Sequence, residues 1–134
     1  MRDPDEAGRW FAQAEDDLRW AEHLAGAGGH NIACFLSQQS AEKALKALLF
    51  SLGEELVTGH SVQTLCKRAA ELVPEMRDKC IRWSFLDSLY LPTRYPDALP
   101  GGIPARAFDD DAANRAIERC REVVEFVRTR LSPA

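Results

Sequence analysis

The sequence predicts an all-α protein, an up-and-down helical bundle of four main helices plus a short helix, with a long proline-rich strap before the last helix. Apolar residues recur three and four positions apart through most of the chain, which is the spacing of a helix face, and no segment alternates as a half-buried strand does. Glycine and proline gather between the periodic segments. A chain of 134 residues suits a single domain spanning 1–134, because it can bury roughly two-thirds of the surface that it exposes when unfolded.

The first expected helix begins close to the N-terminus, where Asp3 or Asp5 can cap it. The glycine-rich stretch at 25–31 ends it. Its apolar positions alternate three and four apart, as the inner face of a bundle helix requires. They are Phe11, Ala14, Leu18, Ala21 and Ala25.

The second expected helix runs from about Asn31 to Leu52 and stops at Gly53. One row of its residues is nearly all apolar. The neighbouring row is apolar at both ends and carries Gln39, Glu42 and Lys46 in its middle. A polar group of this kind beside a core stripe indicates that the helix meets a polar part of the chain there.

Two further helices are expected between the second helix and the strap. Ser61 can cap a third helix that Pro74 closes, and a fourth follows from about Glu75 to Tyr90. The inner face of the third helix is expected to comprise Val62, Leu65, Ala69 and Leu72.

The segment at 91–108, which we call the strap, carries four prolines and two adjacent glycines, so it cannot form a long helix or a central strand. Its aromatic and large aliphatic residues are atypical of disordered linkers, and we expect an ordered segment packed on the bundle.

The last expected helix starts at the acidic cluster 109–111, which suits the positive end of a helix dipole. It continues to Leu131 through an apolar face.

Composition excludes several classes of function. The net charge is -4 and neither end carries a basic block, which argues against general adhesion to nucleic acid or anionic membranes but leaves room for a local basic site. The chain has no apolar run near the ~20 residues of a membrane span, and its start lacks the apolar segment of a signal peptide. We therefore expect a cytoplasmic protein with no membrane partner.

The four cysteines are far apart in sequence and form no Cys-x-x-Cys pair. Each lies in a helical pattern, so we expect reduced core thiols rather than a metal site or a disulfide framework. No cofactor motif is present: the sequence contains neither a P-loop nor a Gly-x-Gly-x-x-Gly fingerprint.

Four stretches together resemble the HEPN family, the higher eukaryotes and prokaryotes nucleotide-binding domain. They are QQSAEKALKALLF at 38–50, GHSVQTL at 59–65, LDSLY at 86–90 and PTRYPD at 92–97. The resemblance covers essentially the whole chain. It implies a helical bundle that is commonly a homodimer and is often encoded beside a minimal nucleotidyltransferase. Many relatives are RNases or the toxin half of toxin–antitoxin pairs.

The nucleases of that family use an Arg and a His separated by four to six residues near the start of the last helix, and this sequence departs from that pattern. Its histidines are His23, His30 and His60, and none follows an arginine at that spacing. The pair Arg19 and His23 has three intervening residues and lies in the first helix. The sequence therefore does not predict the RNase activity of those relatives.

The candidate site gathers polar and aromatic residues from the second helix, the fourth helix and the strap. Pro92 and Pro96 bracket Arg94 and restrict its backbone, and a buried guanidinium requires a carboxylate partner, for which Glu42, Asp87 and Asp97 are the candidates. Glu42 and Gln39 are expected to receive Arg94 or His60. The whole set is either a structural polar network or a nucleotide site: Gln39, Glu42, Lys43, Lys46, His60, Asp87, Tyr90, Arg94, Tyr95 and Asp97.

If the set binds a nucleotide, two kinds of group are needed. Phosphate donors are available from Lys43, Lys46, His60 and Arg94. Stacking surfaces are available from Trp83, Tyr90 and Tyr95, and the spacing of Trp83, Asp87 and Tyr90 places them on one helix face.

Two functions compete. The first is a HEPN-type interaction module that forms a homodimer, partners a minimal nucleotidyltransferase in a toxin–antitoxin-like system, and binds a nucleotide. Leu99, Ile103 and Phe108 of the strap are expected to contribute to the dimer contact. The alternative is a metal-independent RNase toxin, with His60 as the acid or base and Arg94 stabilising charge on the phosphate.

Overall fold

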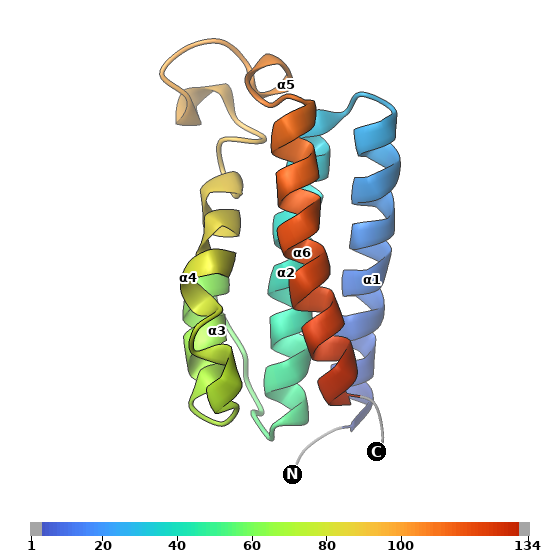
Figure 1. The fold of residues 1–134 in the computed structure, drawn as a ribbon, viewed down its shortest axis with the longest axis vertical. Coiled ribbons are helices and arrows are strands. Elements are labelled where there is room, and N and C mark those ends of the chain that lie inside the picture. Colours follow the sequence, from blue (N-terminus) through green and yellow to red (C-terminus); the bar gives the residue numbers. More distant parts are fainter. Residues whose placement is uncertain (1–3, 132–134) are drawn as a thin grey trace.

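The computed structural model describes residues 4–131, and its fold is the expected all-α bundle (Figure 1). Three long helices form its body: α1 at Pro4–Gly26, α2 at His30–Ser51 and α6 at Asp110–Leu131. Asp3 and the side chain of Asp5, the two expected caps of α1, lie outside the described part. Along residues 4–131, no helix combines the length and apolar character that a membrane span requires.

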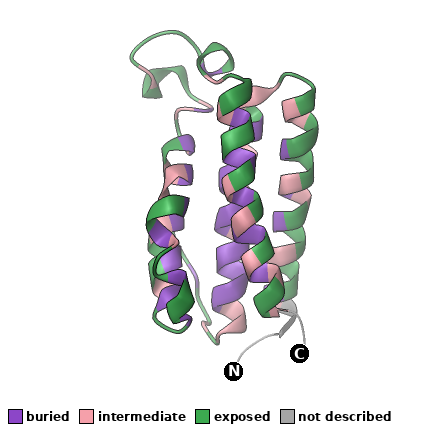
Figure 2. Ribbon diagram, viewed as in Figure 1, coloured by how far each residue is buried: buried purple, intermediate pink, exposed green. Residues whose placement is uncertain are grey.

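The centre of the bundle is α2, which packs against α1, α6 and the shorter helix α3 at Val62–Ala70. A helix surrounded in this way must be buried nearly all round, and α2 is the most continuously buried helix in Figure 2. Burial extends to polar side chains as well as apolar ones. The polar members are Ser37, Gln38, Ser40, Glu42 and Lys46.

The connection between α2 and α3 positions the candidate site. The chain leaves the end of α2, turns back along it, and starts α3 beside the middle of α2 (Figure 1). As a result, the carbonyl of His60 accepts a hydrogen bond from Nε2 of Gln38 at 3.0 Å. Ser61 caps α3 as predicted, because its Oγ accepts a hydrogen bond from the backbone N–H of Thr64 at 3.1 Å.

Two details between 62 and 90 differ from the sequence expectation. Leu72 lies beyond the end of α3 and is 60% exposed, so it is not part of the inner face. The segment expected as one fourth helix is divided into a 3-10 turn η1 at Pro74–Met76, a single α-helical turn α4 at Cys80–Trp83 and a 3-10 helix η2 at Ser84–Leu89. The hydroxyls of Ser84 and Ser88 donate to carbonyls three residues earlier, and such local bonds compete with regular α-helix.

The strap is ordered and packs on the bundle near both of its ends, while its middle arches over one end of the molecule (Figure 1). It contains a 3-10 turn η3 at Pro96–Ala98 and a short helix α5 at Pro104–Ala107 that packs on α2. At its start, the carbonyl of the buried Thr93 accepts a hydrogen bond from Asn31 Nδ2 at 3.0 Å. This contact fixes the chain just before Arg94.

Candidate functional site

A buried carboxylate forms the inner part of the candidate site. Glu42 on α2 is 3% exposed, and its Oε2 lies 3.2 Å from the Nζ of Lys46, which is also buried. Nε2 of Gln38 and of Gln39 each lie 3.4 Å from the other carboxylate oxygen. A buried carboxylate is tolerated when a cation and several donors surround it, as they do here. The polar row expected on this helix is therefore a connected network.

His60 links this network to the surface. Its Nδ1 lies 3.3 Å from Oε2 of Glu42, while its side chain is 61% exposed. The imidazole stacks on the ring of Tyr90 with centroids 5.3 Å apart and an interplanar angle of 16°. The expectation that Glu42 receives His60 is thus met in the structure, and one edge of the imidazole is held by the protein while much of the ring remains exposed.

Arg94 lies on aromatic rings. Its guanidinium carbon is 4.2 Å from the ring centroid of Phe35, 4.8 Å from that of Tyr90 and 5.0 Å from that of Tyr95. Its Nε donates to the carbonyl of Tyr90 at 3.0 Å. These contacts hold the planar group in place through cation–π attraction and one hydrogen bond.

The prediction that a carboxylate pairs with Arg94 is wrong. Among residues 4–131, no salt bridge involves Arg94. Glu42 is occupied by Lys46 and His60. Asp87 accepts from the Oγ of Ser61 and the backbone N–H groups of 62 and 63, so it holds the start of α3. Asp97 is exposed on the strap.

Trp83 does not share a face with Asp87 and Tyr90, contrary to the sequence expectation. It is 1% exposed and points toward α6, where Nε1 donates to Glu122 at 3.1 Å and the ring meets that of Phe126 edge-on at 5.9 Å. The change from α4 to 3-10 geometry after Trp83 alters the angle between successive side chains, which explains the difference. Trp83 is therefore a core residue and offers no stacking surface for a ligand.

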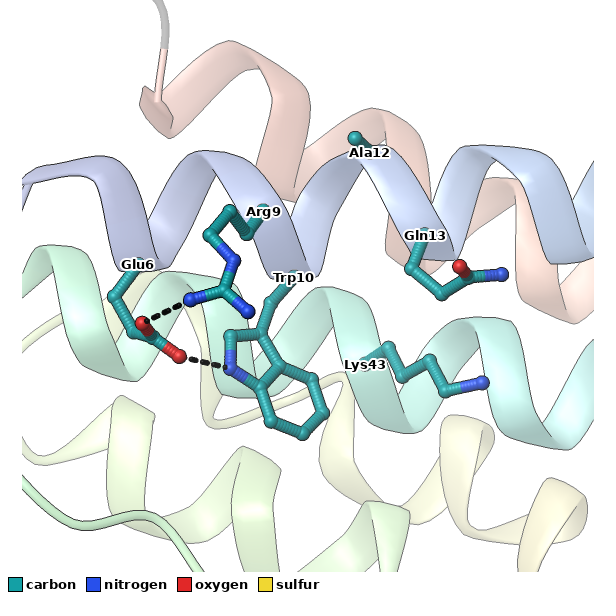
Figure 3. A pocket seen from close by; sticks show the side chains of 6 residues that line it. All are labelled: Glu6, Arg9, Trp10, Ala12, Gln13 and Lys43. Atoms are coloured by element: carbon teal, nitrogen blue, oxygen red, sulfur yellow. Dashed lines mark hydrogen bonds and ion pairs between the residues drawn. The ribbon is translucent and has the colours of Figure 1, made fainter.

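Lys43 also lies apart from the cluster. Its Nζ pairs with Asp17 of α1 at 2.6 Å, and it lines a surface hollow between α1 and α2 with Trp10 and Gln13. Figure 3 shows the side chains of Lys43 and Gln13 pointing in the same direction along this hollow. Neighbouring helix residues are rotated by about 100°, so Lys43 and Glu42 meet different partners.

The strap completes the outer part of the site. Tyr95 is 48% exposed, and it lines a hollow of about 450 Å³ with Leu91, Asp97 and Ala98. The residues that line this hollow are close neighbours of Arg94 in the sequence. Sequence reasoning missed Phe35, which forms the nearest ring contact of Arg94. A signal was present, because Phe35 lies on the same helix row as Gln39 and Glu42.

These features define an all-α bundle domain that brings an arginine, a histidine and two tyrosines together on its surface. We call the group of His60, Tyr90, Arg94 and Tyr95 the His60–Arg94 cluster. Comparison with known proteins places the domain in a class. The sequence profile of the HEPN domain matches residues 7–130. The chain therefore belongs to the HEPN domain family.

Solved structures agree with this assignment. TT1696 from Thermus thermophilus is 37% identical with a TM-score of 0.86, and the match covers 92% of this chain and 97% of that chain. ST0689, described as an archaeal HEPN homologue, is 31% identical with a TM-score of 0.72 over 95% of this chain and 98% of its own. The HEPN domain protein TM0613 from Thermotoga maritima is 29% identical with a TM-score of 0.72 over 94% and 99%. No curated protein matches the sequence.

Proposed function

We propose that this protein is a HEPN interaction module that binds a nucleotide at the His60–Arg94 cluster. The observation that supports the proposal is that Arg94 is held in place by aromatic rings while its terminal nitrogens have no partner among the described residues. Its guanidinium is fixed over three rings and, among the described residues, forms its one hydrogen bond through Nε. Both terminal nitrogens are left for an anion, and two parallel N–H groups match a phosphate.

The surroundings of Arg94 support a nucleotide over a simple anion. His60 lies on the same Tyr90 ring as Arg94 and adds a second donor. The half-exposed ring of Tyr95 stands beside the hollow on the strap and provides a flat apolar surface for a base. Glu42 is neutralised by Lys46 and Asp87 is taken up by α3, so neither carboxylate repels a phosphate strongly.

A nucleotide titration tests the proposal. Calorimetry with ATP on the intact protein should show binding, and Arg94→Gln should weaken it about ten- to hundredfold, because a charge-assisted contact of roughly 1.5–3 kcal/mol is lost. Arg106→Gln is the matched control, since Arg106 is an exposed arginine on the same strap. Equal affinity of both variants and the wild type would contradict the proposal.

A second candidate, a metal-independent RNase, is favoured by one observation: His60 and Arg94, the two residues that it requires, both lie against the Tyr90 ring. The same variants decide between the two. RNA cleavage in the presence of a chelator that is lost in both His60→Ala and Arg94→Gln would support the nuclease. Nucleotide binding without cleavage would support the interaction module.

The proposal includes a homodimer and a minimal nucleotidyltransferase as partner in a toxin–antitoxin-like pair, and membership of the HEPN family supports both. Of the strap residues expected at the dimer contact, Phe108 packs on the core of its own chain, whereas Ile103 is 41% exposed. Sedimentation equilibrium at tens of micromolar should give a dimer, and Ile103→Glu should shift it toward monomer, because a carboxylate would be desolvated in the contact. A monomeric wild type would refute this part.

A further inference from the structure

Two of the four cysteines meet inside the fold. The structure bears out the expectation that all four are free and buried. Cys66 of α3 and Cys80, the first residue of α4, are separated by 14 positions, and their sulfur atoms lie 2.7 Å apart. The carbonyl of Met76 lies 3.4 Å from the Cys80 sulfur and 3.9 Å from the Cys66 sulfur, so both thiols converge on one point between the two helices.

This separation places the two thiols close to bonding distance. A disulfide requires a sulfur–sulfur distance of about 2.05 Å, so an approach of roughly 0.6 Å suffices to form one. Both cysteines belong to short elements that flank the η1 turn, so an adjustment of the turn between them can bring the two sulfur atoms together.

The surface offers access to one member of the pair. Cys80 lines a hollow of about 340 Å³ on the outside of α3 and α4, together with Gln63, Lys67, Glu71 and Arg77. Cationic neighbours are typical of thiols that react with oxidants. Cys66 is fully buried, and burial raises the pKa of its thiol, with a further contribution from the contact with Cys80. Cys80 is therefore the thiol that an oxidant meets first.

We propose that Cys66 and Cys80 are a redox-active dithiol that hydrogen peroxide converts to an intramolecular disulfide. In the first step the sulfur of Cys80 attacks one peroxide oxygen, the O–O bond breaks, and one water leaves, which gives a sulfenic acid on Cys80. In the second step the sulfur of Cys66 attacks that of Cys80 and displaces a second water. Two thiols are oxidised and one peroxide is reduced to two water molecules.

The disulfide would join α3 and α4, the two elements that lie next to His60 and Tyr90 of the His60–Arg94 cluster. His60 directly precedes the Ser61 cap of α3, and Tyr90 directly follows η2, which continues α4. A link that closes a short loop removes freedom from the unfolded chain, so the melting temperature should rise by roughly 5–10 °C and fall again on reduction. Cys34 and Cys120 provide internal controls, because burial raises the pKa of Cys34 to about 11 and that of Cys120 to about 12.

The experiment exposes the reduced wild-type protein to excess hydrogen peroxide at about pH 8, where thiol chemistry is faster. Thiol counts under denaturing conditions should fall from four to two, and peptide mapping should find a Cys66–Cys80 link that a thiol reductant removes. The variant Cys34→Ala/Cys120→Ala should form the same link, and Cys66→Ala should leave Cys80 as a sulfenic or sulfinic acid.

Results of two kinds would overturn the inference. One is retention of all four thiols in the folded wild type after oxidation has gone to completion in a urea-unfolded sample. The other is a crosslink that involves Cys34, Cys120 or a second chain in place of the Cys66–Cys80 pair. Because both are read from the wild-type protein, a variant that fails to fold does not affect them.

Discussion

Replacing Glu42 by alanine should lower the free energy of unfolding by about 3–5 kcal/mol. The reason is the charge that remains: Lys46 is 6% exposed, and removal of the carboxylate leaves its ammonium buried without an anion. Among residues 4–131, its remaining charge-stabilising contact is with the ring of Trp10 at 5.2 Å, which contributes about 0.5–2 kcal/mol and cannot offset the loss. Denaturant unfolding of the variant and the wild type measures the difference.

Two controls separate the buried pair from surface charges. Asp16→Ala breaks an exposed pair with Arg19 and should cost under about 1 kcal/mol. Glu42→Gln/Lys46→Met removes both charges at once and should be more stable than Glu42→Ala, because no buried charge is left unpaired. If Glu42→Ala and Asp16→Ala unfold at the same denaturant concentration, the buried network has no structural role.

Replacing Trp83 by alanine should cost a similar 3–5 kcal/mol, through a different mechanism. The indole is 1% exposed and fills the contact between the single turn of α4 and the long helix α6, so its removal leaves a cavity at this contact. It also removes the donor to Glu122, whose pKa is held below its usual value by Arg82 and, to a lesser extent, by Trp83. Thermal and denaturant unfolding both report this loss.

Matched variants on the same short helix make the result specific. Trp83→Phe keeps most of the volume and loses the hydrogen bond, so we expect a cost of about 1–3 kcal/mol. Ile81→Ala, two residues away at a position that is 78% exposed, should change stability by less than about 0.5 kcal/mol. A Trp83→Ala variant as stable as Ile81→Ala would mean that α4 does not depend on this anchor.

The sequence predicted the helices correctly where the spacing of apolar residues determines the structure. The long helices α1, α2 and α6 each present an apolar face with helical spacing, and their ends carry glycine, a capping residue or an acidic cluster. The prediction was less accurate for the helix expected at about 75–90, because local bonds from the hydroxyls of Ser84 and Ser88 to backbone carbonyls interrupt the α-helix without changing its apolar pattern. Periodicity does not register such breaks.

For the candidate site, the sequence predicted part of the residue set correctly but several of the contacts between its members incorrectly. The polar row on α2 predicted that Glu42 and Gln39 receive Arg94 or His60, and the structure shows the contact of Glu42 with His60. The ring partners of Arg94 were not predicted. Tyr90 and Tyr95 are close to it in sequence, but its nearest ring contact, Phe35, lies on α2, and only the fold brings that ring to Arg94. Lys43 was assigned to the site as a phosphate donor, and Trp83 because its spacing places it on one helix face with Asp87 and Tyr90, yet each points to a different neighbour.

The central claim is that a nucleotide binds at the His60–Arg94 cluster, and nuclear magnetic resonance during an ATP titration tests it most directly. The Nε–H signal of Arg94 and the backbone amides of His60, Tyr90 and Tyr95 should shift together with one binding curve. Amides of Trp10 and Gln13, which line the hollow between α1 and α2, should stay unchanged. Shifts confined to that hollow, or no shifts at saturating ATP, would contradict the account.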